Sequence, residues 1–365
     1  MIKNILIVTS EFPPQPGGIG THAFHLASSL NQRGYKITVV TDQRSDEGIA
    51  ESIYDERLPF AVQRIKKRTP RILMYLDRVY KIFKALKEAD MVIASGKFSL
   101  WVVALCTLFR KRFTFAVIHG TEVNLPSKIN RKLVELALNR FDKIVAVSNY
   151  TKDLITHLNV EVTVIPNGIV VESWQDTGLS TMDELIGYPK LITVGRVSDR
   201  KGQGDVVALL PELLKQFTEL HYHCIGIDVE AKPIIEEAKR LGVDEHVSFH
   251  GVLSNNELKH CLKQGDIFMM LSKPGKDGDV EGFGIAVLEA NAMGIPAIGA
   301  LGSGVEDAII SGVSGHLISL GNAGALTDAI RDILENEQFY KQEARNWAKA
   351  HDWSIIVEQY MLLLP

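Results

Sequence analysis

Short apolar runs alternate with amphipathic stretches along the whole chain. In the first half the runs are Ile5–Thr9, Ile37–Thr41, Met91–Ala94, Thr114–Ile118, Ile144–Val147 and Val162–Ile165. Helical patterns such as Thr21–Gln32 and Arg131–Ala137 separate them. Continuous apolar runs of this length are typical of strands that are buried on both faces. Because such strands alternate with helices, the pattern predicts a parallel, doubly wound sheet.

The same alternation begins again in the second half of the chain. Its strand-like segments are Leu191–Val194, His221–Gly226, Val247–Phe249, Ile267–Leu271, Ala297–Ile298 and Gly315–Ile318. A chain of 365 residues is long enough for two domains of ordinary size. We therefore expect an α/β protein with two Rossmann-like domains, whose strands end at a deep cleft that binds the ligand.

Turn-forming and polar residues mark the expected boundary between the two domains. Pro166-Asn167-Gly168 and the stretch Glu172–Asp183 are low in core residues. This places the domains at residues 1–166 and 167–350. The amphipathic segment Trp353–Leu364, within residues 351–365, is expected to be a helix that packs back toward the first domain.

Composition places the chain among globular proteins of the cytoplasm. Hydrophobic residues make up 46% of the sequence and charged residues 23%, which is ordinary for a soluble domain. Cys106, Cys224 and Cys261 are far apart and fit neither a CxxC nor a zinc spacing, so reduced thiols are the simplest interpretation. The longest apolar runs have strand length, and the opening segment is too short for a signal peptide.

Charge is distributed unevenly between the two halves. Residues 1–166 carry 24 Lys and Arg against 15 Asp and Glu, whereas the rest of the chain has a net charge of −13. Many of the cations lie in residues 64–87, among apolar and aromatic positions. This segment is either one solvated face of an ordinary helix or a helix that lies on an anionic membrane surface, which would make the protein peripheral at the inner face. No nucleic-acid-binding module is recognisable, so nucleic acid is not an expected partner.

Two glutamates, Glu281 and Glu289, bracket the most informative segment of the chain. The glycines before Ile285 and the good helix formers after it predict a helix that begins near Gly284. Glu281 then lies in the loop at the helix N-terminus, and Glu289 lies about 12 Å further along the axis. Glycosidase carboxylate pairs are about 5 to 9.5 Å apart, so these two are not expected to cleave one bond together. Two acceptors beside free N–H donors suit an elongated, hydroxyl-rich, partly anionic ligand such as a nucleotide-sugar.

Two cations follow a strand of the second half. Leu191–Val194 leads into Gly195-Arg196, and Lys201-Gly202 follows before a helical pattern. Arg196 and Lys201 should therefore lie at the carboxyl end of that strand, where a planar guanidinium and a mobile ammonium can both neutralise a diphosphate. The alternative is a pair of surface cations near the start of a helix.

A glycine loop follows the first strand. Gly17 and Gly18 allow the backbone to approach a phosphate closely, with a helix N-terminus behind it. Gly18-Ile-Gly20-Thr-His-Ala23 also fits a dinucleotide fingerprint, and Asp42 ends the next strand, so a nicotinamide enzyme is an alternative. In such enzymes, however, the first glycine follows the strand almost at once, whereas Glu11 to Pro16 intervene here.

Further candidates lie at the ends of other strands. His119 ends a buried strand and could bind a sugar hydroxyl or ease developing charge. Ser148 is either the N-cap of a helix or a residue on the acceptor side. Asp277 and Asp279 are a weak metal signal without further ligands, and residues 273–279 are better interpreted as a polar loop over the cleft. The pairs His22 with His25 and His221 with His223 are interpreted as packing or surface residues.

Together these residues closely resemble glycosyltransferase family 4, whose retaining enzymes have the two-domain GT-B fold. The resemblance covers nearly the whole chain. The motifs that carry it are Gly17-Gly18, His119-Gly-Thr-Glu122, Val147-Ser148, Ile165-Pro-Asn-Gly168, Gly195-Arg196 with Lys201-Gly202, Glu281-Gly-Phe-Gly284 with Glu289, and Gly302-Ser-Gly304-Val-Glu306. Ile169-Val170 and Ser303 depart from the residues that are common in the family.

The resemblance implies a role for each site residue. Glu281 would contact hydroxyls of the donor sugar, helped by N–H groups in the Gly282-Phe283-Gly284 segment, and Glu289 would hold the ribose. Arg196 and Lys201, after Gly195, would bind the diphosphate together with the Gly17-Gly18 backbone. His119 would face the sugar near the reacting carbon. Residues 1–166 would be the acceptor side and residues 167–350 the donor side. Similar enzymes need no metal.

The resemblance also implies the function. We expect a retaining transfer of a sugar from a UDP- or GDP-sugar, such as mannose, glucose or GlcNAc, to a glycan or lipid-linked acceptor in polysaccharide, lipopolysaccharide or glycolipid biosynthesis. No cofactor beyond the nucleotide-sugar co-substrate is expected. Two alternatives stay open, namely an NAD-dependent Rossmann enzyme and a non-catalytic nucleotide-sugar binding protein.

Overall fold

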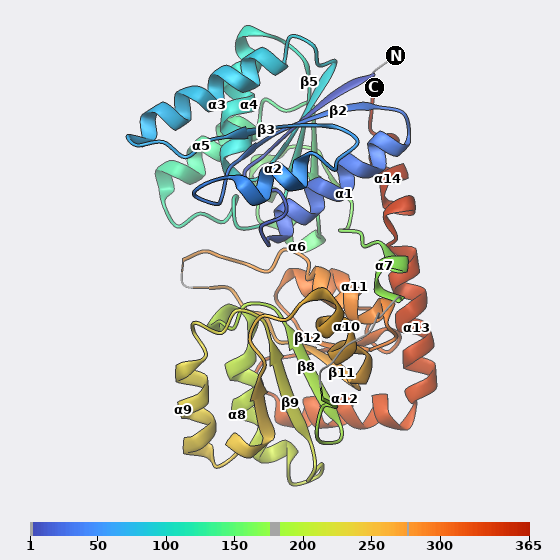
Figure 1. The fold of residues 1–365 in the computed structure, drawn as a ribbon. Helices are drawn as coiled ribbons and strands as arrows, with labels where there is room; N and C mark the ends of the chain where they lie inside the picture. Colours follow the sequence, from blue (N-terminus) through green and yellow to red (C-terminus); the bar gives the residue numbers. More distant parts are fainter. Residues whose placement is uncertain (1–2, 176–182, 276) are drawn as a thin grey trace. The chain divides into compact units, whose positions relative to one another are not determined.

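The computed structural model describes residues 3–175, 183–275 and 277–365. Contacts divide the chain into two compact units (Figure 1). Unit 1 is Met1–Gly168 together with Trp353–Pro365, and unit 2 is Ile169–Asp352. Residues 176–182 of the expected boundary stretch, and residue 276 of the expected polar loop, lie outside the described residues.

Unit 1 is built on a seven-stranded parallel sheet. Its strands, in spatial order, are β3 (Ala61–Ile65), β2 (Lys36–Asp42), β1 (Asn4–Thr9), β4 (Met91–Ser95), β5 (Phe113–Ile118), β6 (Lys143–Ala146) and β7 (Val162–Val164). The interior strand β1 is buried from Ile5 onward, as expected for a parallel strand with helices on both faces. Ile5 is in register with Ile37 of β2 and with Met91 of β4.

The sequence pattern missed the edge strand β3. Its residues alternate between exposed and less exposed positions, with Ala61 and Gln63 open to solvent and only Ile65 fully buried. Because β3 is exposed or only partly buried over most of its length, it lacks the continuous apolar run that identified its neighbours. The opposite edge strand, β7, is likewise only partly buried.

The helices of unit 1 connect the strands in the doubly wound manner. They are α1 (Gly18–Gln32), α2 (Ile49–Asp55), α3 (Arg71–Ala85), α4 (Lys97–Phe109), α5 (Lys128–Leu138), α6 (Asn149–Asp153), the short η1 (Thr156–Leu158) and α14 (Trp353–Met361). Buried residues of α3, α4 and α5 share one core with the sheet. Helix α14 packs along α1 (Figure 1), where Arg33 forms an ion pair with Glu358 at 2.6 Å.

Unit 2 contains a six-stranded parallel sheet. Its spatial order is β10 (Val247–Phe249), β9 (His221–Ile225), β8 (Lys190–Val194), β11 (Ile267–Met270), β12 (Ala297–Ala300) and β13 (Gly315–Ile318). The two doubly wound parallel sheets that the sequence predicted are thus confirmed.

The helices of unit 2 complete its two layers around the sheet. They are α7 (Val171–Gln175), η2 (Asp199–Lys201), α8 (Gln203–Leu213), α9 (Lys232–Leu241), η3 (Asp244–His246), α10 (Asn255–Gln264), α11 (Ile285–Ala292), η4 (Gly304–Ala308), α12 (Ala323–Glu335) and α13 (Glu337–Ala350). Within the described residues, no helix of either unit has both the length and the apolar character needed to cross a bilayer.

Strand order identifies the ligand-binding edge of each sheet. In unit 1 the strand order switches between β1 and β4, which are neighbours in the sheet although β2 and β3 separate them in the sequence. In unit 2 the corresponding switch lies between β8 and β11. Ligands of doubly wound sheets bind at the carboxyl ends of the strands beside such a switch point. The glycine loop follows β1, and the Arg196–Lys201 segment follows β8, so both lie at this edge of their own unit.

Candidate functional site

In unit 2, the carboxylate of Glu281 forms ion pairs with two cationic side chains that follow β8. Lys201 Nζ and Arg200 Nη1 each lie 2.6 Å from Glu281 Oε2. Arg200 also contacts Asp279, with 2.8 Å between Nε and Oδ2. The side chains of Glu281 and Lys201 are largely buried, at 14% and 13% exposed. These contacts form a charged cluster of one carboxylate shared by two cations.

The charge state of Glu281 follows from this cluster. Burial alone would raise the pKa of the carboxyl group, but the charges and hydrogen bonds of Lys201 and Arg200 lower it to about 2. Glu281 is therefore a carboxylate at neutral pH. A carboxylate is a strong hydrogen-bond acceptor, the type of group that a sugar hydroxyl needs.

Two glycines allow the cations to reach this position. Gly202 has φ +79°, and a Cβ at this residue would lie 2.0 Å from the carbonyl oxygen of Leu271. Gly195, with φ +145°, lies against the aliphatic part of Lys201, whose Cε would be 3.4 Å from an added Cβ. Both residues adopt the left-handed backbone region that side chains disfavour, so they are required for geometry rather than for chemistry.

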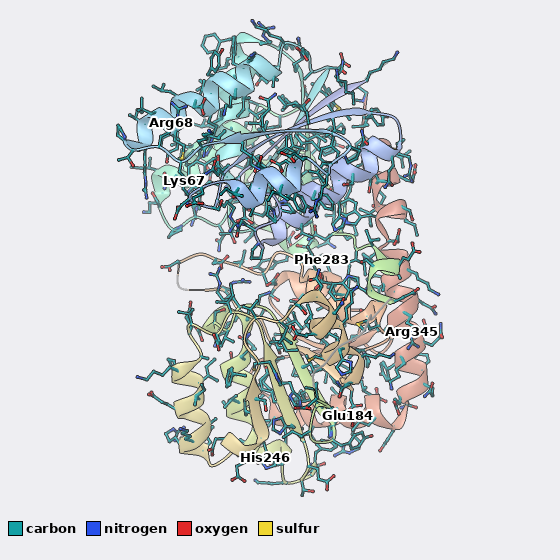
Figure 2. All side chains as sticks on the ribbon, viewed as in Figure 1. Lys67, Arg68, Glu184, His246, Phe283 and Arg345 are labelled. Atoms are coloured by element: carbon teal, nitrogen blue, oxygen red, sulfur yellow. The ribbon has the colours of Figure 1, made fainter. Side chains whose placement is uncertain are left out.

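The backbone around Glu281 is fixed by a second glycine loop. Gly284 is the N-cap of α11, as the sequence predicted, with φ +94°. The N–H of Gly304 donates to the carbonyl of Glu281 at 2.9 Å, and a Cβ at Gly304 would lie 2.2 Å from the Gly282 backbone. Phe283, labelled in Figure 2, is 1% exposed. The loop that presents Glu281 is therefore anchored from both sides.

Glu289 lies just over one turn inside α11 and has a different environment. Burial raises the pKa of its carboxyl group to about 7, although the charge of Lys201 acts in the opposite direction. Lys201 is thus electrostatically coupled to both glutamates, while only Glu281 is in direct contact with it. The side chain of Glu289 is poised to gain or lose a proton near neutral pH.

Of the other predicted residues of unit 2, Asp279 joins this cluster through Arg200, whereas Arg196 and Lys273 do not. Arg196 follows β8 but is exposed. Asp279, which the sequence offered as half of a weak metal signal, forms an ion pair with Arg200. Lys273 of the polar loop contacts Asp199 and Asp205, at 2.9 and 2.7 Å. Among the described residues, no group of three or more His, Cys, Asp or Glu side chains is arranged to hold a metal ion.

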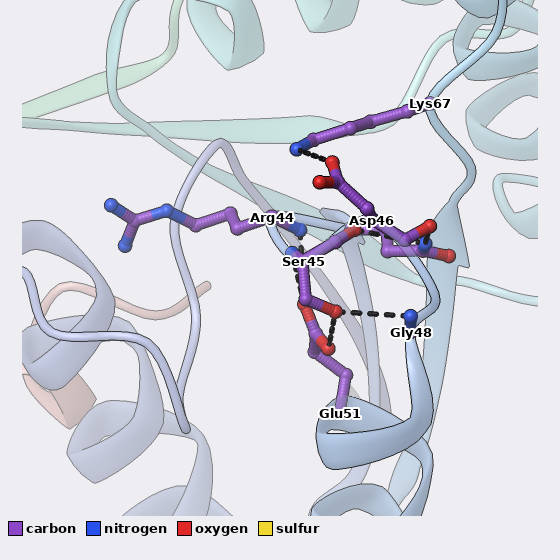
Figure 3. Close-up of polar contacts among 7 residues, drawn as sticks. Arg44, Ser45, Asp46, Gly48, Glu51 and Lys67 are labelled. Carbon is purple, nitrogen blue, oxygen red and sulfur yellow. Dashed lines mark hydrogen bonds and ion pairs between the residues drawn. The ribbon is translucent and has the colours of Figure 1, made fainter.

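In unit 1 the glycine loop begins helix α1. Gly17 is the N-cap of α1, no side chain caps this helix end, and its first turn contains no acidic residue. Arg44 Nη1 donates to the carbonyl of Pro16 at 2.8 Å, which ties the loop after β2 to the glycine loop. Figure 3 shows how Glu51 fixes that second loop by accepting from the N–H groups of Arg44 and Ser45, at 3.0 and 2.7 Å.

His119 follows β5 and is held by the neighbouring strand. Its Nε2 lies 2.9 Å from the hydroxyl of Ser95, the last residue of β4. The ring of His22 packs against it at a centroid distance of 5.0 Å, and His22 Nε2 lies 2.9 Å from the hydroxyl of Tyr360 in α14. Burial lowers the pKa of His119 to about 3, so the imidazole is neutral at physiological pH.

Glu122 and Ser148 lie at the same edge of the sheet. Glu122 Oε1 accepts from the N–H of His119 at 2.5 Å, and burial raises the pKa of Glu122 to about 7. Ser148 is fully buried and is the N-cap of α6, where its Oγ accepts from the N–H of Thr151 at 2.9 Å. The N-cap interpretation of Ser148 therefore describes its contacts, and an acceptor-side role stays a prediction.

Several residues of these clusters were not found from the sequence. Arg200 contacts Glu281 although 81 positions separate them, and Ser95 reaches His119 from another strand. The sequence predicts His22 to be a packing or surface residue; it is buried and packs against His119, with Tyr360 as its hydrogen-bond partner. The only available signal was the position of Ser95 at a strand end and of Arg200 beside Lys201.

Two sequence profiles match the chain and together cover most of it. The profile described as Glycosyltransferase Family 4 matches residues 16–173. The profile described as Glycosyl transferases group 1 matches residues 184–351. The first match includes the glycine loop, His119 and Ser148, and the second includes Lys201, Glu281 and Glu289.

Individual proteins are similar over almost the full length. A GDP-mannose-dependent alpha-(1-6)-phosphatidylinositol monomannoside mannosyltransferase of Mycolicibacterium smegmatis is 27% identical, over 90% of this chain and 89% of the relative. The crystal structure of Anabaena HepE in complex with UDP and glucose has a TM-score of 0.77 at 19% identity and covers 99% of this chain and 98% of HepE. A sucrose-phosphate synthase of Thermosynechococcus elongatus has a TM-score of 0.78 at 18% identity, with the same coverage.

Proposed function

Since the chain belongs to glycosyltransferase family 4, within the group 1 glycosyltransferases, we propose that it is a retaining hexosyltransferase. It takes a sugar from a UDP- or GDP-sugar and transfers it to a hydroxyl of a glycan or lipid-linked acceptor. The observation that carries the proposal is the cluster of Lys201 and Arg200 on the buried carboxylate of Glu281. It combines a hydroxyl acceptor with cations that suit a diphosphate.

In this proposal, different residues of unit 2 bind different parts of the donor. Glu281 accepts hydrogen bonds from hydroxyls of the sugar, and the N–H groups of Phe283 and Gly284 donate to the sugar's oxygens. Glu289 binds the ribose hydroxyls, and Arg196 and Lys201 bind the diphosphate. In this structure both Lys201 and Arg200 contact Glu281. When the donor binds, Lys201 turns away from Glu281 toward the diphosphate, and Arg200 remains as the partner of Glu281.

The residues of unit 1 serve the same reaction. The backbone of Gly17 and Gly18 binds phosphate oxygens at the uncapped start of α1. His119, neutral because it is buried, faces the sugar as a hydrogen-bonding group rather than as a charged acid. Ser148 lies on the acceptor side. The basic segment 64–87 contacts an anionic membrane surface, which places the enzyme peripherally at the inner face of the membrane.

The proposed mechanism uses leaving-group stabilisation. When the bond between the sugar and the diphosphate breaks, negative charge develops on the diphosphate, and Lys201 and Arg196 stabilise it as it forms. The acceptor hydroxyl attacks from the side of the leaving group, and the β-phosphate takes its proton. This route retains the configuration at the reacting carbon and needs neither a carboxylate nucleophile nor a metal.

A donor screen tests the function directly. We expect a nucleoside diphosphate and its sugar to raise the melting temperature, because a ligand at about 100 times its Kd stabilises a protein by about 2.7 kcal/mol. UDP, GDP and ADP are compared with NADH, and release of the diphosphate is measured with and without EDTA. Stabilisation by NADH alone would support a dehydrogenase. Binding of a nucleotide-sugar without any hydrolysis or transfer would support a binding protein.

One contact already disfavours the dehydrogenase. A dinucleotide enzyme of this fold uses an acidic residue after its second strand to bind the ribose. Here the corresponding residue, Asp42, forms an ion pair with the buried Arg78 at 2.6 Å. The carboxylate of Asp42 is thus paired with Arg78 of helix α3, so it is not free to bind a ribose.

The raised pKa of Glu289 predicts that nucleotide binding depends on pH. Two ribose hydroxyls need an ionised acceptor, and the pKa of Glu289 is raised to about 7, so binding competes with protonation as the pH falls. We expect the Kd of the nucleoside diphosphate, measured by calorimetry, to rise about tenfold between about pH 8 and pH 6. The Glu289→Gln variant should bind more weakly and retain only the pH dependence of the phosphate itself. The exposed Glu335→Gln is the matched control, and a wild-type profile in Glu289→Gln would refute the ribose contact.

A further inference from the structure

Unit 1 contains a cavity of about 660 Å³ that is lined by helix α2, by the edge strand β3 and by the loop before α2. Pockets that bind small molecules have volumes of about 300 to 1,000 Å³. None of the residues assigned to donor binding lines this cavity, and neither His119 nor Ser148 does. The cavity therefore has the size of a binding site but has no role in the function proposed above.

Hydrogen bonds hold the loop wall of the cavity in place. The carboxylate of Glu51 accepts from the N–H groups of Arg44 and Ser45, and Ser45 Oγ accepts from the N–H of Gly48 at 3.0 Å (Figure 3). Glu51 is only 1% exposed, so its oxygens serve the protein itself. This wall is thus formed by the fold, and Glu51 is part of its support rather than a group that is free for a ligand.

Arg64 of β3 is the buried cation that lines the cavity. Its Nε and Nη2 bind the carboxylate of Asp55 at 2.9 and 2.7 Å, and Nη2 also donates to the carbonyl of Pro13. The side chain is 10% exposed, and Cζ lies 5.6 Å from the ring centroid of Phe12. The third nitrogen, Nη1, is buried and has no hydrogen-bond partner among the described residues. A buried donor without a partner is costly, and a ligand with an acceptor group would relieve that cost.

The exposed part of the lining offers hydrogen-bond acceptors. Glu47 and Glu56 are exposed, and their side chains form no ion pair or hydrogen bond with another described residue. The exposed Ser52 of α2 adds a hydroxyl group, and the exposed Lys66 adds a second cation. Carboxylates outnumber cations in this lining. A ligand therefore meets free acceptors at the opening and an unsatisfied donor on Arg64.

These groups favour a neutral ligand that is rich in hydroxyls. An anion such as phosphate would be repelled by Glu47 and Glu56, and a polyamine would offer no acceptor to Arg64. A hydroxyl group both donates and accepts, so it can satisfy either kind of group. Phe60 and Val62 give the lining an apolar part, which suits the C–H face of a sugar ring.

We propose that the cavity between α2 and β3 is a subsite for a neutral sugar residue of the acceptor glycan, other than the one that carries the reacting hydroxyl. Two contacts connect it to the glycine loop, because Arg64 donates to the carbonyl of Pro13 and Arg44 to that of Pro16. The proposal rests on the proposed function in one respect, since a glycosyltransferase meets glycans and this favours a sugar over a peptide. It implies an acceptor with at least two sugar residues.

Oligosaccharide binding by the full chain tests the proposal. The protein is applied to an array of neutral oligosaccharides, from disaccharides to hexasaccharides, and the best ligand is titrated by calorimetry beside spermine, inorganic phosphate and trialanine. We expect saturable binding of a neutral oligosaccharide and no binding of the other three probes. Absence of oligosaccharide binding would overturn the proposal.

A variant that fills the cavity shows where the oligosaccharide binds. Ala61 lines the cavity and is exposed, so Ala61→Trp should weaken binding at least tenfold without lowering the melting temperature. Ala50→Trp, at an exposed alanine of α2 outside the lining, is the matched control and should bind like wild type. Oligosaccharide binding that Ala61→Trp leaves unchanged would refute the subsite. Binding of spermine, phosphate or trialanine that this variant removes would assign the cavity to another ligand and would also refute it.

A second variant tests the acceptor groups. Ser52→Ala with Glu56→Gln should weaken oligosaccharide binding about three- to tenfold, because both changes remove acceptors for sugar hydroxyls. Glu161→Gln, at an exposed glutamate of unit 1 outside the lining, is the matched control. Arg64→Ala is not used, because it would leave the carboxylate of Asp55 unpaired and destabilise unit 1. Unchanged affinity in the double variant would contradict the proposed contacts.

Stabilisation of the wild-type protein by a nucleoside diphosphate separates this proposal from the proposed function. It is measured without oligosaccharide. A protein that binds an oligosaccharide in the cavity but no nucleotide would refute the function and retain a sugar site. A protein that binds and hydrolyses a nucleotide-sugar but binds no oligosaccharide would retain the function and refute the subsite.

Discussion

Lys201→Ala is expected to lower kcat by about 10²- to 10³-fold, the usual cost of removing a group that stabilises charge in a transition state. In the proposed mechanism the ammonium neutralises the diphosphate as it leaves, when the departing charge is largest. The largely buried position of Lys201 strengthens this effect, because few water molecules can replace the lost cation. Steady-state turnover with the donor identified in the screen measures the change.

The control for this variant is Lys215→Ala, which removes an exposed lysine of the same unit whose partner is Glu212. Surface pairs of this kind contribute little to stability, so turnover should not change. The far-ultraviolet spectrum and the melting temperature of both variants should stay close to wild type. Unchanged turnover in Lys201→Ala would exclude the assigned role.

Glu281→Gln is expected to lower sugar transfer strongly while nucleotide binding survives. The amide has almost the shape of the carboxylate but no charge and only one acceptor oxygen, so contacts with sugar hydroxyls are weakened. Transfer should fall by about 10²-fold or more, whereas the Kd of the free nucleoside diphosphate should change only a few-fold. The comparison requires one transfer assay and one calorimetric titration of the same preparation.

The same substitution removes the shared partner of Lys201 and Arg200, so its effect on folding must be measured separately. Arg200 retains its contact with Asp279, which limits the loss. Retained nucleotide binding serves as the proof that unit 2 is folded. Glu236→Gln, at an exposed position of α9, is the neutral comparison. Normal transfer by Glu281→Gln would disprove the sugar contact.

The buried parts of the fold could be predicted from the sequence because their signal is local. Strands such as β1 and β5 are nearly continuous apolar runs, and helix α11 begins where Gly284 ends the loop. Strand β3 carries no such signal, because it lies at an edge of the sheet and its residues alternate between exposed and partly buried positions. The confirmed two-sheet architecture thus follows from the strands with an apolar run, whereas the edge strand β3 needed the structure.

The candidate site also has a part that local motifs predict and a part that only the folded structure reveals. Lys201 and Glu281 could be found because each lies in a short motif with recognisable glycines. Their direct contact, and the participation of Arg200, depend on how β8 and α11 are placed in the folded unit. The contact between His22 and Tyr360 joins residues 338 positions apart. No local pattern encodes a contact of that kind.

Helix α14 has a consequence for the order in which the protein can be made. Its residues complete unit 1, where Tyr360 bonds to His22 and Glu358 pairs with Arg33, yet the ribosome adds them only after all of unit 2. Unit 2 is one continuous stretch of chain and can fold as soon as it has emerged. The contacts of α14 with α1, and with them the neighbourhood of His119, can therefore be completed only after unit 2 has been synthesised.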